Sequence, residues 1–308
     1  MTDLAVHVSH LTRRFGDFVA VKDVTFDVGR GEIFGYLGAN GAGKSTTIRI
    51  LCGLLAASEG EATVSGVDVV RKPDAVRQVI GYMSQKFSLY LDMTVQENLE
   101  FFGGAYGLFG KKFRLRRDAV SEELELAELG DRITGSLPGG LRQRLALACA
   151  VLHQPGIVFL DEPTAGVDPE ARRMFWRLIR RLADDGTTIF VTTHYMDEAE
   201  YCDRVGLMVT GRLAALDTPG SLKETFVPGR MLEVRGASAE EVRQAADGLP
   251  LLGVEPFGAA LHVRVPAPGP SANEVEGTLK RQGLAGVHVA DAEVTLEDVF
   301  LTVVREDA

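Results

Sequence analysis

Short apolar runs alternate with amphipathic stretches through most of the chain. Residues 33–37, 157–160 and 188–192 are runs of four or five residues dominated by apolar side chains. Runs of this length without polar alternation are typical of strands that are buried on both faces of a parallel sheet. Between them lie stretches with helical spacing, such as the apolar stripe from Leu141 to Leu152. The pattern predicts an α/β fold in which helices flank a mostly parallel sheet.

The last part of the chain has a different pattern. Residues 227–229, Val-Pro-Gly, contain two turn-forming residues and indicate a linker between a first domain, residues 1–226, and a second, residues 227–308. After this linker the pattern predicts a strand, a helix, two strands, a helix, a strand and a final helix. This order is typical of a small α+β domain, and we expect it to have an accessory or regulatory role because it carries no catalytic cluster.

Residues 38–45 read Gly-Ala-Asn-Gly-Ala-Gly-Lys-Ser and lie between the predicted strand 33–37 and a helix-like stretch. Three glycines permit a tight turn whose N–H groups point inward, and at the start of a helix such groups bind phosphate. Lys44 adds a positive charge for the terminal phosphates, and the hydroxyl of Ser45 is suited to hold Mg²⁺. The alternative, a plain glycine-rich turn, does not explain the strand before the loop and the helix after it.

Polar residues also follow the other two predicted strands. Asp161 and Glu162 end the segment 157–162, and His194 comes soon after residue 192. Because ligands bind at the carboxyl ends of parallel strands, we expect the loop, the acidic pair and the histidine to converge. Asp161 can orient water around Mg²⁺, and Glu162 can polarise a water for attack on a terminal phosphate. Taken singly, the acidic pair could cap a helix and the histidine could be a packing residue.

Composition limits the possible partners and location. The chain has 308 residues, which favours two domains, and a net charge of −10, which argues against a broad nucleic-acid-binding surface. Its three cysteines are scattered without metal-ligand spacing, as in proteins of reducing compartments. We find neither a secretory signal nor an apolar run of about 18 residues, so we expect a cytoplasmic protein that does not itself span a bilayer.

Five ordered motifs together resemble the ATP-binding cassette family, the nucleotide-binding subunits of ABC transporters, over roughly residues 4–226. The motifs are GANGAGKST at 38–46, GYMSQ at 81–85, SLPGGLRQRLALA at 136–148, IVFLDEPTAGVDP at 157–169 and VTTHYMDEAE at 191–200. The resemblance implies a P-loop NTPase cassette with a helical subdomain at about 86–150, with ATP and Mg²⁺ as cofactors. It also implies that Glu162 and His194 act in ATP hydrolysis with Lys44.

The resemblance assigns further roles to individual residues. It implies that Gln85 helps to ligate Mg²⁺, that Asp168 belongs to a loop crossing between two subunits, and that the ring of Phe15 stacks on adenine. By itself, Phe15 would more often be a core residue. The expected ATP-binding residues are Phe15, Gly38, Ala39, Asn40, Gly41, Ala42, Gly43, Lys44, Ser45, Thr46, Gln85, Pro138, Gly139, Gly140 and Asp168, and the expected metal ligands are Ser45, Gln85 and Asp161.

The family resemblance implies an ATPase subunit at the cytoplasmic face of the membrane. It would work as a homodimer that closes on ATP and drives a separately encoded transmembrane permease. Residues 294–301, Val-Thr-Leu-Glu-Asp-Val-Phe-Leu, resemble extensions of ATPases that drive drug and polysaccharide exporters. Two alternatives stay open. One is a soluble cassette protein acting on ribosomes or nucleic acid, although the sequence has a single phosphate loop. The other is a nucleotide-sensing regulator with little turnover, against which Glu162 argues.

The sequence departs from the family at residues 137–141. Leu-Pro-Gly-Gly-Leu stands where the family usually has a Leu-Ser-Gly-Gly-Gln-like signature, so the serine hydroxyl that would contact a partner's terminal phosphate is absent. Pro138 is acceptable in the first turn of a helix, and Gly139 and Gly140 can still donate N–H groups to phosphate. We therefore expect slow but real hydrolysis of ATP.

Overall fold

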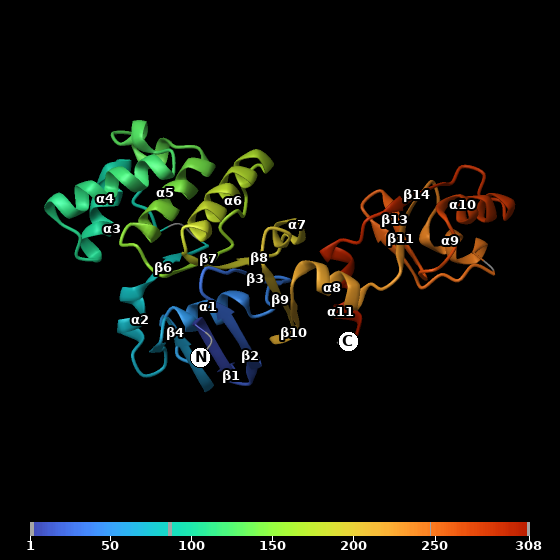
Figure 1. Cartoon of the computed structure of the whole chain (residues 1–308), viewed down its shortest axis with the longest axis horizontal. Coiled ribbons are helices and arrows are strands. Elements are labelled where there is room, and N and C mark those ends of the chain that lie inside the picture. Colours follow the sequence, from blue (N-terminus) through green and yellow to red (C-terminus); the bar gives the residue numbers. More distant parts are fainter. Residues whose placement is uncertain (1–2, 86–87, 247, 307–308) are drawn as a thin grey trace. The chain divides into compact units, whose positions relative to one another are not determined.

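The computed structural model of the chain describes residues 3–85, 88–246 and 248–306. The chain divides into two compact units, Met1–Asp217 and Thr218–Ala308 (Figure 1). Among the described residues, no helix combines the length and the apolar character needed to cross a membrane.

A six-stranded sheet forms the centre of the first unit within the described part of the chain, in the order β10-β9-β3-β8-β7-β6. The strands are β3 (Ile33–Gly38), β6 (Ile80–Met83), β7 (Ile157–Asp161), β8 (Thr188–Thr193), β9 (Arg204–Val209) and β10 (Arg212–Asp217). Neighbouring strands are parallel except for β9 and β10. Every residue of β3, β7 and β8 is buried, which explains their uninterrupted apolar runs. The predicted α/β fold is confirmed.

An antiparallel sheet packs against the first one. Its order is β2-β1-β4-β5, and its strands are β1 (Leu4–Phe15), β2 (Phe18–Gly29), β4 (Glu59–Val64) and β5 (Val67–Asp68). Phe26 of this sheet stacks on Phe34 of the central sheet with 5.4 Å between ring centroids, and it lies 5.6 Å from the ring of Tyr36. Helix α1 (Lys44–Leu51) contributes Ile48 and Leu51 to the same core. The apolar core therefore fixes the helix that follows the phosphate loop.

Helices cover the rest of the first unit. They are α2 (Pro73–Val79), α3 (Val95–Ala105), α4 (Gly110–Glu123), α5 (Gly139–Val151), α6 (Pro169–Asp184) and the short α7 (Met196–Ala199), with 3-10 turns at Ala127–Leu129 and Thr134–Ser136. Helices α3, α4 and α5 pack on one another, in the region expected to form a helical subdomain (Figure 1). Thr94 and Glu97 form a capping box at the start of α3. The side chain of Arg116 on α4 donates to the carbonyls of Val151 and Leu152 at the end of α5.

The second unit contains a four-stranded antiparallel sheet in the order β12-β13-β11-β14. Its elements are α8 (Pro219–Phe226), β11 (Arg230–Arg235), α9 (Ala239–Ala245), β12 (Gly253–Phe257), β13 (Ala260–Val265), α10 (Ala272–Arg281), β14 (His288–Ala292) and α11 (Leu296–Glu306). The order of strands and helices is the predicted one. From β11 to β14 it is the βαββαβ arrangement of ferredoxin-like folds.

The division between the units falls after Asp217, earlier than the expected boundary after residue 226. Helix α8 packs against α11, the last helix of the chain, so it belongs to the second unit. The residues 227–229 that the sequence marks as a linker therefore join two elements of one unit.

Candidate nucleotide-binding site

The phosphate-binding loop runs from Gly38, the last residue of β3, to Lys44, the first residue of α1. Gly43 has a φ of 105°, and a Cβ atom added there would lie 2.5 Å from the carbonyl oxygen of Ala20. Only glycine fits such a position. The side chain of Lys44 is buried, and its Nζ atom donates to the carbonyls of Gly38 at 2.8 Å and Ala39 at 3.2 Å. The loop thus closes around its own lysine.

The remaining residues of the motif differ in exposure. Ala39, Asn40 and Gly41 form the exposed tip of the loop, whereas Ala42 is buried. Ser45 and Thr46 lie half-buried in the first turn of α1. The N–H groups at this turn are the donors that a helix leaves without partners within the helix, so the loop offers an electropositive start to α1.

Asp161 is the last residue of β7 and is fully buried. Its Oδ1 atom accepts hydrogen bonds from Ser45 Oγ at 2.9 Å and from Thr192 Oγ1 at 2.8 Å. Its Oδ2 atom is buried and has no hydrogen-bond partner among the described residues. A buried carboxylate oxygen without a partner is costly, and it is the type of ligand that Mg²⁺ prefers.

Glu162 is the residue on which the expected site converges. Its Oε1 atom lies 3.5 Å from Lys44 Nζ, and its Oε2 atom accepts from Gln85 Nε2 at 3.1 Å and lies 3.3 Å from His194 Nδ1. These side chains come from the phosphate loop, the segment after β6, the end of β7 and the end of β8. The predicted convergence of loop, acidic pair and histidine at one edge of the sheet is confirmed.

The backbone holds Glu162 in an uncommon conformation. Its φ is 49°, and its N–H donates to both the carbonyl and the hydroxyl of Thr192, at 3.1 and 3.0 Å. A positive φ at a residue other than glycine costs about 1–3 kcal/mol and is concentrated at functional sites. Here the hydrogen bonds to Thr192 hold the strained residue against the neighbouring strand.

The electrostatics of the cluster centre on Lys44. Burial lowers the pKa of its ammonium group, whereas the carboxylates of Glu162 and Asp161 raise it. The side chain of Glu162 is itself almost wholly buried, at 7% exposure, and that of His194 is about one third exposed. The cluster therefore holds a buried cation beside the buried carboxylate of Glu162, with a partly exposed histidine next to that carboxylate.

Several expected residues lie apart from this cluster, since none of them hydrogen-bonds to it within the described residues. Phe15 ends β1 and is 46% exposed, with the guanidinium of Arg13 over its ring at 4.5 Å, so it is not a core residue. Asp168 caps α6 by accepting from two backbone N–H groups of its first turn. Gly139 and Gly140 are the first residues of α5, and a Cβ on Gly140 would lie 2.9 Å from that of Ala171.

Pro138 occupies the N-cap position of α5 and not the first turn, where the sequence suggested it. Its φ of −53° suits proline, and its carbonyl accepts from the N–H groups of Leu141 and Arg142, at 3.1 Å each. Its side chain makes no capping hydrogen bond. The first N–H groups of α5 therefore lack the side-chain acceptor that a serine would supply.

Sequence reasoning missed two residues that support the site. Thr192 bonds to both Asp161 and Glu162, as described above. Glu198 is fully buried and accepts from the hydroxyls of Thr164 at 2.5 Å and Thr193 at 2.6 Å, with Arg172 Nε at 3.4 Å. The signal was present, since Thr192 and Thr193 are polar residues that follow the apolar run 189–191, but the residues that Thr192 contacts come from a distant segment.

Comparisons with known proteins agree with this geometry. The family model described as ABC transporter matches residues 21–165. A second model, described as AAA domain, putative AbiEii toxin, Type IV TA system, matches residues 136–196, a segment that lacks the phosphate loop. The solved structure of CbiO1 from Clostridium perfringens, part of the ABC transporter complex CbiONQ, is 29% identical. It superimposes with a TM-score of 0.66 and covers 80% of this chain and 96% of that one.

Two curated relatives carry the comparison further. The probable multidrug ABC transporter ATP-binding protein YbhF of Escherichia coli (strain K12) is 51% identical over 221 residues, which are 72% of this chain and only 38% of YbhF. The daunorubicin resistance ATP-binding protein DrrA2 of Streptomyces coeruleorubidus is 37% identical. The matched region covers 98% of this chain and 95% of DrrA2.

The fold and the site define a P-loop nucleotide-binding protein. The chain belongs to the ABC transporter family.

Proposed function

We propose that this chain hydrolyses ATP and that the reaction occurs at the Glu162 cluster. The observation that carries the proposal is the position of the Glu162 carboxylate, within 3.5 Å of Lys44, Gln85 and His194 at the edge of the sheet where the phosphate loop ends. A buried, strained carboxylate destabilises the fold more than a neutral residue at the same position would. Its presence beside a phosphate loop therefore indicates a chemical role.

Each residue has a distinct task in this proposal. The loop N–H groups and Lys44 bind the phosphates and neutralise charge, which supplies most of the rate for a loose phosphoryl-transfer transition state. Glu162 orients a water and takes its proton as the water oxygen bonds to the terminal phosphorus, and ADP leaves with the electrons of the broken P–O bond. His194 contacts the charge that develops on the transferred group.

The residues present fit a Mg²⁺ ion. Ser45 and Asp161 would hold it, because the Oδ2 atom of Asp161 is buried without a partner among the described residues, and Gln85 would reach it from the segment after β6. A bound Mg²⁺ supplies positive charge to the phosphate oxygens. Oxygen donors of this kind are the ones that Mg²⁺ prefers.

We further propose that two copies of the chain close on ATP and drive a separate transmembrane permease, from the cytoplasmic face of the membrane. Phe15 would meet the adenine, while Gly139, Gly140 and Asp168 would approach the nucleotide of the other copy. Their position outside the Glu162 cluster supports a role across an interface. The names of the relatives, multidrug and daunorubicin resistance, favour an exporter.

The experiment is the variant Glu162→Gln. It keeps the size of the side chain and the hydrogen-bonding capacity but removes the base, so we expect the protein to retain ATP and lose release of phosphate. Glu61→Gln, the same change at an exposed position on β4, serves as the matched control and should hydrolyse ATP at the wild-type rate. Phosphate release by Glu162→Gln equal to that of Glu61→Gln would contradict the assignment.

A further inference from the structure

The sheet of the second unit has two chemically different faces. Alternate residues of β11, β12 and β13, among them Leu232, Val254 and Val263, face the apolar core shared with α9 and α10. The residues between them point to the opposite face, where cross-strand pairs bring Glu233 and Glu255 beside His262. In an antiparallel sheet such a polar face usually lies in water. Here part of it is covered.

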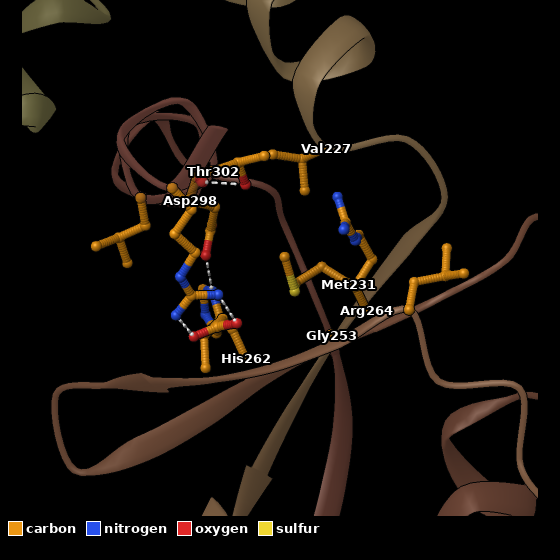
Figure 2. Close-up of a pocket in the computed structure, with 11 residues that line it drawn as sticks. Val227, Met231, Gly253, His262, Arg264, Asp298 and Thr302 are labelled. Carbon is orange, nitrogen blue, oxygen red and sulfur yellow. Dashed lines mark hydrogen bonds and ion pairs between the residues drawn. The ribbon is translucent and has the colours of Figure 1, made fainter. Parts of the chain in front are cut away.

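Helix α11 covers this polar face. Asp298 of α11 accepts from Nδ1 of His262 at 2.7 Å, and Arg305 of α11 pairs with Glu255. Between the helix and the sheet lies a cavity of about 160 Å³, with Val227, Met231 and Leu301 on its apolar side. Figure 2 shows Val227 and Met231 at this space, with His262 on the sheet and Asp298 on the helix.

The histidine and the aspartate form the buried part of the cavity. Their side chains are only 3% and 5% exposed. The Oδ2 atom of Asp298 accepts from the N–H and the hydroxyl of Thr295, both at 2.8 Å, so Asp298 acts as an acceptor throughout and Nδ1 of His262 is the donor. The ring of Phe257 stacks on the imidazole at 3.8 Å. No hydrogen bond joins the other ring nitrogen, Nε2, to a described residue.

One guanidinium in the cavity stands apart from the paired side chains. Asp298 is paired with His262, and Glu255 with Arg305. Arg264 donates to the carbonyl of Phe226 at 3.2 Å, and among the described residues it has no carboxylate partner. Its guanidinium lies on the Val227 side of the space, apart from His262 and Asp298 (Figure 2). A guanidinium with free donors is the group that binds a carboxylate with two parallel hydrogen bonds.

We propose that this cavity is a binding site for a small monocarboxylic acid with a compact apolar body. Its carboxylate pairs with Arg264, and its apolar part rests on Met231 and Leu301. The volume favours a small ligand, since it is below the roughly 300–1,000 Å³ typical of pockets for drug-sized molecules. A single unpaired arginine matches a single negative charge. This site is separate from the nucleotide site and does not depend on ATP hydrolysis.

The test uses the purified full-length chain and titration calorimetry with two probes of different shape, benzoate and 3-methylbutanoate, at up to millimolar concentrations. Benzamide and inorganic phosphate are the comparison ligands, because the first lacks the charge and the second lacks the apolar body. We expect at least one carboxylate to bind with one site per chain, and neither comparison ligand to do so. Failure of both carboxylates to bind, or equal binding of benzamide, would overturn the proposal. Binding of phosphate in their place would identify a general anion site and would also overturn it.

Variants locate the binding. Arg264→Gln should weaken it by about tenfold or more, the loss of a charge-assisted pair, whereas Arg281→Gln on α10 keeps the wild-type affinity. Leu301→Trp fills the cavity without changing its charge and should abolish binding, which keeps the test independent of any effect of Arg264 on folding. Carboxylate binding that survives both Arg264→Gln and Leu301→Trp would place the ligand elsewhere and contradict the proposal.

Discussion

At the scale of single residues, the site depends on a few side chains whose tasks follow from their chemistry. The sequence alone predicted that Lys44, Asp161, Glu162 and His194 would meet, because their place after apolar runs puts them at the carboxyl edge of a parallel sheet. Thr192 was not predicted. Its role arises from the register in which β7 and β8 pair, which brings its hydroxyl beside Asp161. Register is a property of the sheet and cannot be read from either strand.

The prediction at the scale of single residues concerns Pro138. Pro138→Ser supplies an N-cap acceptor for the first N–H groups of α5 and restores the hydroxyl that the family signature usually has at this position. We expect the free energy of unfolding to rise by about 1 kcal/mol, from capping, and ATP turnover to increase. Urea unfolding and steady-state phosphate release measure the two effects. Pro138→Ala lacks the hydroxyl and is the matched control. Turnover of the serine variant no higher than that of the alanine variant would count against a role for the hydroxyl.

At the scale of elements, local signals specified most of the helices. The start of α3 is one example, because the capping box of Thr94 and Glu97 acts within four residues. The extent of the second unit was harder to predict. Helix α8 joins it by packing against α11, at the other end of that unit, and no signal near Val227 reports such a contact. The turn residues at 227–229 are real signals of a loop but do not show which unit the preceding helix joins.

Glu198 connects several elements and gives the element-scale prediction. Glu198→Ala removes the acceptor shared by Thr164, after β7, and Thr193, on β8, and leaves Arg172 of α6 without a buried partner. We expect the free energy of unfolding to fall by about 3 kcal/mol. This is the lower end of the range for removing one partner of a buried ion pair, because the side chain of Arg172 is 17% exposed. We also expect slower phosphate release, since Thr164 and Thr193 lie beside Glu162 and His194. Chemical unfolding and an ATPase assay test both.

The control for this prediction is Glu170→Ala, in the exposed first turn of α6, which should change the free energy of unfolding by less than about 0.5 kcal/mol. Equal stability of the two variants would show that the Glu198 network does not hold these segments together.

At the scale of the whole molecule, the chain combines a nucleotide-binding unit with a second unit of its own topology. The first was predictable because its motifs occur in a fixed order along buried strands. The order of elements in the second was predictable, but its cavity was not. That cavity requires His262 and Arg264, on one face of β13, to meet Asp298 and Leu301 of α11. Nothing in the sequence of β13 reveals that a distant helix covers this face.

The most direct test of the account is the mass and nucleotide content of Glu162→Gln in solution with Mg²⁺ and labelled ATP, measured by light scattering after gel filtration. We expect a dimer that retains one ATP per chain, and a monomer when ADP replaces ATP. A protein that stays monomeric and elutes without label in Mg²⁺ and ATP would contradict the proposal that two copies close on the nucleotide at the Glu162 cluster.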